Sequence, residues 1–348
     1  MSEMRDLMLR TLDRIVADTL DVNARTAADG GAAFPQKLWE ALEAQGMTAI
    51  GEVGEGDLGF ADAMALIQRA AFHTVPVPFG ETVLARRLLA GAGMDIPEGV
   101  LTVAPPGATE GVVLTSGRLA GLAAAVPWGR QAAHVVVAAG RELVLAGVLG
   151  AVVRQDVSMA GEPRDTLDLG QAGVVASAPL TEAGAIVQAE GALLRAVQMA
   201  GALARVLDLS LVWANDRVQF GKLIAKFQAV QHLMAQLAAE VAAAGAAADL
   251  AVEASIGGPD RFAIGVAKSR TGEAAGKGAA IAHQAFGAMG FTREHPLHYA
   301  TRRLWSWRDE FGAEAYWQTE IGRAVAAKGA DRLWAMLTDG AEPYMNAP

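Results

Sequence analysis

Apolar and polar positions divide the chain into two helical parts and one part rich in strands. Over residues 1–98, apolar side chains recur every three or four positions, first between Leu7 and Leu20, which is the spacing of the buried face of a helix. The same spacing predicts further helices over 61–72 and 81–92. We therefore expect an N-terminal helical domain.

Between residues 99 and 181 the pattern changes to short runs of β-branched and aliphatic residues. Gly, Pro or Asp separates these runs at intervals of about ten residues, which is typical of a small antiparallel barrel or sandwich. The absence of a long helix between them argues against a doubly wound parallel sheet. The runs begin at Leu101, Val112, His134, Leu143, Ala151 and Val174.

From residue 182 to residue 348 the helical spacing returns. The segments that carry it are 193–211, 223–241 and those that begin near Arg261 and Ala313. Runs of alanine in this part allow helices to approach each other closely, so we expect a helical bundle. The predicted fold is mainly α with a central β-domain.

Composition excludes several classes of protein. With 52% apolar and 19% charged residues over 348 positions, the chain is neither disordered nor collagen-like. It contains no cysteine, which rules out disulfides, Cys-zinc sites, iron–sulfur clusters and thiol nucleophiles. The 38 acidic residues outnumber the 29 basic ones and no basic stripe is visible, which argues against a nucleic-acid partner.

The chain shows no sequence sign of a membrane protein. It starts with a polar stretch, Met1 to Asp6, rather than a secretory signal. The longest apolar run, Leu143 to Val153, is eleven residues long, against about 20 needed to cross a bilayer. We expect a cytoplasmic protein without a membrane span.

Two apparent motifs carry little weight. Gly54 to Gly59 has the dinucleotide spacing G-x-G-x-x-G, but Glu55 and Asp57 would place negative charges beside a phosphate and no βαβ unit surrounds it. We interpret it as a loop between helices. The six histidines do not have the spacing of metal ligands, so no metal site is predicted.

The informative residues lie in two segments of the C-terminal third, 216–231 and 283–297. Arg217 stands at a break between two long helices, where a guanidinium is well placed to bind an anion. Gly287 and Gly290 allow a backbone to come close to a ligand. From spacing alone, an ordinary salt-bridged arginine and two tightly packed glycines are the favoured interpretation, and a ligand site is the alternative.

These two segments resemble the acyl-CoA dehydrogenase family. The corresponding family patterns are R-x-x-F-G-x-x-(I/L)-x-x-(F/H)-Q and Q-x-x-G-G-x-G-(F/Y)-x-x-E-x-P, and both occur here in order and at the expected separation. Residues 54–89 are also similar to members of the family. The resemblance implies an N-terminal helical domain (1–98), a small antiparallel β-barrel or sandwich (99–181) and a C-terminal four-helix bundle (182–348).

The resemblance also implies FAD, held between the β-domain and the C-terminal helices across a subunit interface of a dimer or tetramer. Arg217 would pair with the pyrophosphate of a neighbour's FAD, and Ala288 replaces the second glycine of the family pattern. The residues implied to line the cofactor are Gln219, Phe220, Phe227 and Gln228, and those implied at its adenosine end are Gln284, Gly287 and Ala288.

The family reaction removes the α-proton of an acyl-CoA thioester while the β-hydrogen leaves as hydride to the flavin. In most members the base is a Glu in an aromatic-Glu-Gly turn, a position that is Phe311 here, with Glu310 beside it. A minority use an earlier helix, where the position is Gly191 and its neighbour is Glu190. A shift of one residue turns a helical side chain by about 100°, so Glu310 is the better candidate.

Three hypotheses follow from the resemblance. The chain is a homo-oligomeric acyl-CoA dehydrogenase that uses Glu310, or a non-catalytic subunit that completes a partner's FAD site in a heteromer, or a flavin oxidase or monooxygenase relative. The family motifs F-x-(L/M)-T-E-P-x-A-G-S-D and W-I-T-N-G, which serve the flavin ring, are missing around Leu101 and Trp128. An electron-transfer flavoprotein is the electron acceptor that the resemblance implies.

Overall fold

The computed structural model describes residues 3–51 and 58–338. Tertiary contacts group the chain into two compact units, one of Met1–Ala70 with Val75–Leu194 and one of Ala71–Thr74 with Arg195–Pro348. The predicted division into three domains remains a prediction. The glycine pattern that starts at Gly54 lies largely outside the described residues.

The N-terminal part is helical, as expected, and five α-helices lie among its described residues. They are α1 (Glu3–Thr19), α2 (Val22–Ala28), α3 (Gln36–Ala44), α4 (Phe60–Phe72) and α5 (Phe79–Gly91). The helices predicted over 61–72 and 81–92 are confirmed within two residues. Arg69 of α4 donates from Nε to Oδ1 of Asp13 in α1 at 2.6 Å, so an ion pair joins two of the helices.

Helix α5 is buried along most of its length. The hydroxyl of Thr82 donates to the carbonyl of Leu101 at 3.0 Å and accepts from its N–H at 3.2 Å. This exchange satisfies a buried hydroxyl. It also fixes α5 against the first strand of the β-domain.

The strands of the central part, among the described residues, form two four-stranded sheets. The first contains β1 (Leu101–Val103), β4 (His134–Ala139), β5 (Glu142–Gly147) and β8 (Gly173–Pro179), and the second contains β2 (Thr109–Thr115), β3 (Arg118–Pro127), β7 (Arg164–Asp168) and β6 (Val152–Arg154). Apolar side chains of both sheets belong to one core. Among the described residues the sheets do not close into a barrel, so the sandwich is the correct one of the two predicted architectures.

One strand pair differs from the antiparallel prediction. β1 pairs with β4 in parallel, with Leu101 opposite His134. The chain leaves β1, forms β2 and β3 in the other sheet, and returns to the first sheet in its original direction. A crossover of this kind permits parallel pairing, whereas a tight hairpin does not.

Two strands carry no sequence signal of a strand. β3 is rich in alanine, and β7 reads Arg-Asp-Thr-Leu-Asp, so neither has the usual β-branched composition. The carboxylate of Asp165 in β7 is fully buried and accepts from Nη2 of Arg130 at 2.6 Å. This tertiary partner allows a charged residue in a central strand.

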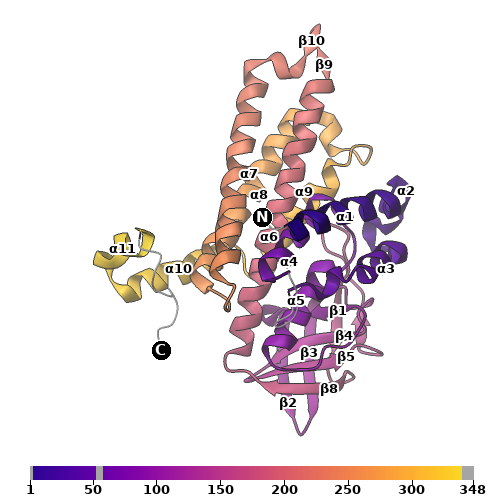
Figure 1. The fold of residues 1–348 in the computed structure, drawn as a ribbon, viewed down its shortest axis with the longest axis vertical. Helices are drawn as coiled ribbons and strands as arrows, with labels where there is room; N and C mark the ends of the chain where they lie inside the picture. The colour runs from indigo at the N-terminus through magenta and orange to yellow at the C-terminus, as the bar shows by residue number, and fades with distance from the viewer. Residues whose placement is uncertain (1–2, 52–57, 339–348) are drawn as a thin grey trace. The chain divides into compact units, whose positions relative to one another are not determined.

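The second unit is helical. It contains the C-terminal part of α6 (Ala183–Asp216) with α7 (Gln228–Ala254), α8 (Arg261–Phe286), α9 (Leu297–Asp309), α10 (Glu314–Lys328) and α11 (Leu333–Thr338). Figure 1 shows α6 and α7 as two long antiparallel helices, with β9 and β10 at the end that joins them. Apolar residues of α6, α7, α8 and α9 share one core, as a four-helix bundle requires.

Helices α6 and α7 are long and apolar enough to cross a membrane, judged by length and composition alone. The expectation that no stretch approaches this length was therefore wrong. In α6, 61% of the most apolar window is buried inside the protein, and in α7 only 28% is buried. The larger burial, that of α6, is typical of a core helix in a bundle. Packing inside the protein therefore explains the apolar composition of α6.

Candidate functional site

The first predicted segment forms a tight hairpin at the end of α6. The N–H of Arg217 donates to the carbonyl of Trp213, and the carbonyl of Arg217 accepts from the N–H of Ile224, both at 2.9 Å. β9 (Val218–Gln219) then pairs with β10 (Lys222–Leu223). Arg217 is thus anchored by its backbone, while its side chain is exposed.

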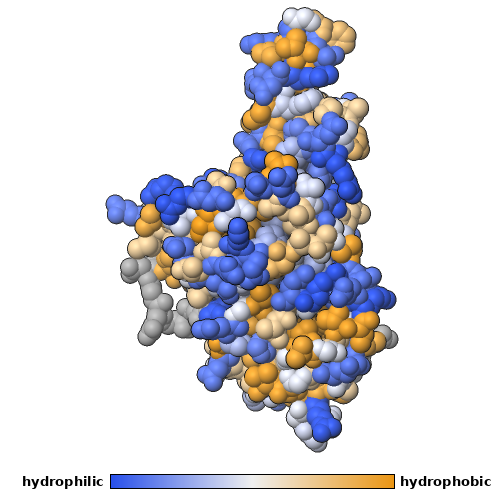
Figure 2. Space-filling model, turned by 90° about the vertical axis from the view of Figure 1, so that its right-hand side faces the viewer, coloured by the Kyte–Doolittle hydropathy of each residue, from blue (hydrophilic) through white to orange (hydrophobic). Residues whose placement is uncertain are grey.

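The turn of this hairpin holds an aromatic ring in solvent. Phe220 and Gly221 have φ values of 53° and 78°, the pair of positive values that a two-residue turn of type I′ requires. Glycine accepts this conformation readily, but a bulky side chain rarely adopts it. Phe220 is 91% exposed, and Figure 2 shows apolar side chains at this end of the hairpin, at the top of the view.

The other predicted cofactor residues of this segment lie beside the turn. The ring of Phe227 meets that of Phe220 edge to face at 6.1 Å, and Nζ of Lys222 lies 4.3 Å from the Phe227 centroid. Gln219 and Gln228 are exposed. The hairpin therefore gathers a cation, two aromatic rings and two amides on an open surface.

An aromatic cluster connects the two predicted segments. The indole of Trp213 stacks on Phe286 with centroids 5.0 Å apart and meets His295 at 5.8 Å. Cζ of Arg217 lies 5.5 Å from the centroid of the same indole. Arg217 and Phe286, which lies at the C-terminal end of α8, thus both contact the indole of Trp213.

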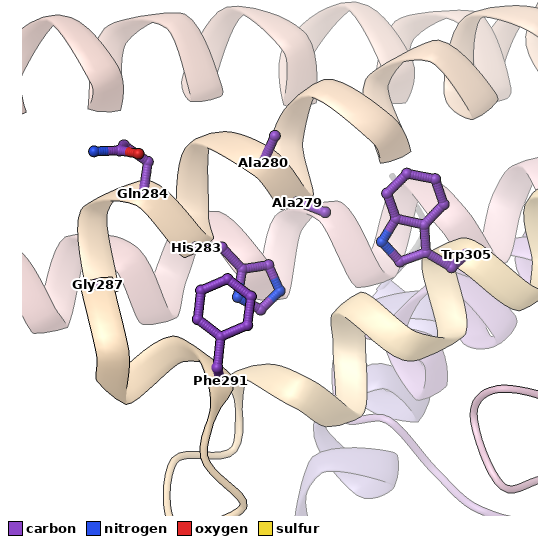
Figure 3. A pocket seen from close by; sticks show the side chains of 7 residues that line it. All are labelled: Ala279, Ala280, His283, Gln284, Gly287, Phe291 and Trp305. Carbon is purple, nitrogen blue, oxygen red and sulfur yellow. The ribbon is translucent and has the colours of Figure 1, made fainter.

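The second segment borders a cavity of about 490 Å³. Gln284 and Gly287 line it, together with Ala279, Ala280, His283, Phe291 and Trp305, as Figure 3 shows. Gly287 ends α8 with φ 60° and ψ −139°, and no atom lies within 4 Å of the place where a Cβ would be. Ala288, the next residue, is exposed. The backbone here is open to a ligand.

Two histidines lie at the connection from α8 to α9, and the pKa of each is lowered. Burial lowers the pKa of His283, and contact with the backbone of Gly290 opposes part of this shift. Burial also lowers the pKa of His295, and the charge of Arg205 adds to it. Nδ1 of His295 accepts from the N–H of Leu297 at 3.2 Å, so this ring needs its lone pair to cap α9.

We expect the free energy of unfolding to fall as the pH is lowered from 7 to 5. An unfolded histidine binds a proton near its ordinary pKa of 6.5, whereas the folded rings bind it only at lower pH, so the unfolded state is favoured in this window. Urea unfolding at both pH values measures the effect. His295→Phe should reduce the pH dependence, and His232→Phe, at an exposed site on α7, is the control; an unchanged dependence in the first variant would contradict this account.

The predicted catalytic position lies in the turn between α9 and α10. Phe311, which stands where the family places its glutamate, is 5% exposed and has φ 53°. Oε2 of Glu310 accepts from Nε and Nη2 of Arg195 at 2.8 and 2.7 Å. Since the guanidinium of Arg195 is fully buried, the charge of Glu310 is needed to compensate it.

Further contacts fix this turn. Nζ of Lys268 donates to the carbonyls of Arg308 and Gly312 at 2.6 and 2.8 Å, and Nε1 of Trp317 donates to the carbonyl of Phe311 at 3.0 Å. Burial lowers the pKa of Lys268 to about 8, against the opposing charges of nearby glutamates. These hydrogen bonds fix the turn between α9 and α10, and the carboxylate of Glu310 in this turn forms an ion pair with Arg195.

The alternative candidate for the base, Glu190, also forms an ion pair. Nε of Arg87 in α5 donates to both of its carboxylate oxygens at 3.1 Å. Burial raises the pKa of Glu190, and the charge and hydrogen bonds of Arg87 oppose this shift. Cζ of Arg87 also lies 3.7 Å from the centroid of Phe60, so the pair is a packed structural element of the first unit.

The sequence analysis missed the residues that surround these motifs. Arg195 lies in a long, mostly apolar stretch of α6, and a lone charge in such a stretch is a signal of a buried partner. Lys268 of α8 has Arg270 and Glu273 close by in the sequence, so no such signal marks it. Trp305 stands in α9, a helix that the pattern did not predict. No spacing in the sequence connects Trp305 with the cavity on α8.

Comparison with known proteins agrees with the motifs. The sequence profile of the family described as "Acyl-CoA dehydrogenase, C-terminal domain" matches residues 189–326. A relative from Mycobacterium tuberculosis (strain ATCC 25618 / H37Rv), acyl-CoA dehydrogenase IpdE2, is 30% identical over 312 residues, which cover 86% of this chain and 91% of the relative.

Solved structures show the same fold. A variant of the Tcur3481-Tcur3483 steroid ACAD has a TM-score of 0.84 at 21% identity and covers 94% of this chain and 99% of its own. The ChsE4-ChsE5 complex from Mycobacterium tuberculosis has a TM-score of 0.81 at 21% identity and covers 94% and 98%. The fold and the resemblance inferred from the sequence are thereby confirmed, and the chain belongs to the acyl-CoA dehydrogenase family of oxidoreductases.

Proposed function

We propose that the chain takes part in FAD-dependent α,β-dehydrogenation of an acyl-CoA thioester as one subunit of a heteromeric enzyme. In this assembly it completes the FAD site of a partner subunit, and the partner supplies the catalytic base. The observation that carries the proposal is the turn after α9, where Phe311 occupies the expected place of the base and Glu310 compensates buried Arg195.

The described residues fit a flavin dinucleotide. Arg217 is an exposed, backbone-anchored guanidinium, and such a group presents several N–H donors to a diphosphate and keeps its charge. The open backbone at Gly287 would admit the adenosine end. FAD, when bound, accepts the hydride that leaves the β-carbon of the acyl group.

The chain's own residues would bind and orient the cofactor. Arg217 would neutralise the diphosphate, while the rings of Phe220 and Phe227 would shield one side of the site from water. The carboxamides of Gln219, Gln228 and Gln284 offer donors and acceptors for the remaining polar atoms. At the position where the family places its proton-abstracting carboxylate, this chain has Phe311.

A partner subunit is supported by the surface of α7 and by a similar assembly. Only 28% of the most apolar window of α7 is buried in the isolated chain, and an apolar face of this kind is suited to cover by another protein. The ChsE4-ChsE5 structure is a complex. A bulky acyl group is the substrate we propose, in line with the steroid class named for the Tcur3481-Tcur3483 protein.

Co-expression with a second family member that carries the missing glutamate tests the proposal. We expect the chain alone to be colourless and inactive, and the co-purified complex to be yellow and to be bleached by acyl-CoA without oxygen. Replacement of the partner's base should abolish turnover in the complex. A yellow lone chain that is bleached by acyl-CoA would refute the heteromeric proposal.

The homomeric hypothesis has one observation in its favour. The side chain of Glu310 retains 17% exposure, although Arg195 holds it, so this side chain is not sealed inside the protein. If Glu310 is the base, Glu310→Gln in an active enzyme removes turnover with little loss of flavin, and unchanged turnover excludes this residue. Rapid oxygen consumption would instead favour the oxidase hypothesis. The cytoplasmic location and the electron-transfer flavoprotein acceptor stay predictions.

A further inference from the structure

The turn between α9 and α10 holds a bulky residue in a conformation that glycine favours. Phe311 and Gly312 have φ values of 53° and 92°, and Phe311 is buried. A bulky residue keeps a positive φ where its surroundings fix it, and such residues gather at functional sites. Position 311 is also where the family resemblance places the base, so the direction of its side chain is a functional property of the turn.

Three helices each contribute a donor group to this turn. Arg195 of α6 donates to the carboxylate of Glu310. The indole of Trp317 in α10 donates to the carbonyl of Phe311. The third donor, Lys268 of α8, is 1% exposed and bonds to the backbone on both sides of the turn.

Lys268 bridges the end of α9 and the approach to α10. Its Nζ donates to the carbonyl of Arg308 at 2.6 Å and to that of Gly312 at 2.8 Å. The carbonyl of Arg308 lies in the last turn of α9, where carbonyls lack a partner within the helix and a positive charge is favourable. The two bonds span residues 309–311, so they fix the separation of the two ends of the turn.

The same face of α8 carries two glycines beside the lysine. Lys268, Gly272 and Gly276 follow each other at intervals of four residues, which is the spacing of one helix face. A Cβ at Gly272 would overlap the carboxylate of Glu314, and one at Gly276 would lie 3.3 Å from Nη1 of Arg308. These two side chains form an ion pair. The glycines therefore let the end of α9 and the start of α10 lie directly against α8.

The charges around Lys268 oppose one another. Burial lowers the pKa of Lys268 to about 8, the nearby carboxylates oppose this shift, and the charge of Arg195 adds to it. The amine therefore changes its charge in a pH range in which the protein can be studied. The charged groups that face it from α6, α9, the turn and α10 are Arg195, Arg308, Asp309, Glu310 and Glu314.

We propose that Lys268 is a positioning residue that holds this turn in its left-handed conformation and thereby sets the direction of the side chain at position 311. An apolar side chain of similar length would fill the same space but leave the carbonyls of Arg308 and Gly312 without this donor. The turn would then be free to relax. This role of Lys268 does not depend on the proposed function, because it applies whether or not a partner supplies the base.

Exchange of the Trp317 indole N–H with deuterium, followed by NMR in the purified chain, reports on the turn, because this proton bonds to the carbonyl of Phe311. We expect Lys268→Met to accelerate this exchange about tenfold, in line with the net worth of one or two hydrogen bonds. Exchange of the buried indole of Trp307 in α9 should stay unchanged. Lys277→Met, at an exposed site of the same helix, is the matched control and should change neither rate.

Restoring the amine tests whether the donor itself matters. The chain contains no cysteine, so Lys268→Cys can be alkylated at this single position in urea and refolded. Bromoethylamine returns an amine at the length of a lysine and should restore slow exchange of Trp317. Iodoacetamide adds no amine and should not restore it. This pair also decides the question if Lys268→Met does not fold.

The pH dependence of stability gives a second measurement. The free energy of unfolding should rise as the pH is raised from 7 to 9, because the folded lysine loses its proton near pH 8 while the unfolded one keeps it up to its ordinary pKa of 10.5. Lys268→Met should remove this rise. A rise of the same size in the variant would contradict the assignment of the titrating group to Lys268.

The outcomes separate positioning from general stabilisation. Equal acceleration at Trp317 and Trp307 would show a general loss of stability and would overturn the role of Lys268. Unchanged exchange in Lys268→Met, or equal rates in the two alkylated forms, would overturn it as well. A yellow lone chain that is bleached by acyl-CoA would refute the heteromeric proposal and leave this role of Lys268 standing.

Discussion

Arg217→Ala is expected to lower the affinity of the assembled enzyme for FAD about a hundredfold, because hydrogen bonds to a charged group are each worth about 1.5–3 kcal/mol. The guanidinium stands at a hairpin whose backbone is fixed on both sides by hydrogen bonds of 2.9 Å. Its removal should therefore change the binding surface without disturbing the fold. Flavin content after gel filtration and titration of the apoenzyme with FAD measure the loss.

Two further variants sharpen this test. Arg217→Lys keeps the charge but not the planar array of donors, so we expect an intermediate affinity. Lys222→Ala removes a cation of the same hairpin that lies over Phe227 and is the matched control, with a smaller effect. Full flavin retention in Arg217→Ala would show that the diphosphate is bound elsewhere.

Glu310→Gln is expected to lower the free energy of unfolding by about 3–5 kcal/mol, because it leaves a buried arginine without its compensating charge. Arg195 has no exposed side-chain surface and its guanidinium lies about 6 Å from the rings of Trp307 and Phe311. Neither aromatic ring supplies the full negative charge that the carboxylate of Glu310 provides. Urea unfolding of the purified chain at pH 7 gives the difference.

The double variant Arg195→Met with Glu310→Gln should recover much of this loss, since it removes both buried charges together. The control is Arg323→Met, which removes an exposed arginine from its pair with half-buried Glu320 and should cost less than about 1 kcal/mol. Equal destabilisation by the single and the double variant would show that the two charges do not compensate each other. The double variant is also the better one for measuring turnover, because it leaves no unpaired charge.

Most helices and most strands could be predicted because their apolar residues repeat with the period of the element. The spacing from Leu7 to Leu20 and the runs at His134 and Leu143 mark surfaces that must be buried, whatever they pack against. β7 and α9 escaped prediction, and for β7 the reason is that its buried Asp165 is stable only beside a partner 35 positions away in the chain. Asp165 needs Arg130.

The candidate site was predictable only in part. Arg217 and Gly287 stand in motifs of fixed spacing, so the sequence indicates both residues and a shared role. The sequence also indicates that Phe311 has replaced the expected glutamate. It contains no sign that Glu310 pairs with Arg195, because 115 positions separate them.

The order of residues by itself determined most of the helices and strands, the presence of family motifs for a dinucleotide, and the absence of a glutamate from the usual catalytic position. Only the tertiary structure decided what the remaining carboxylates do and that Trp305 faces the cavity on α8. The physical reason is that periodic burial is a property of neighbouring residues. A buried charge or an aromatic wall, in contrast, depends on side chains that folding alone brings together.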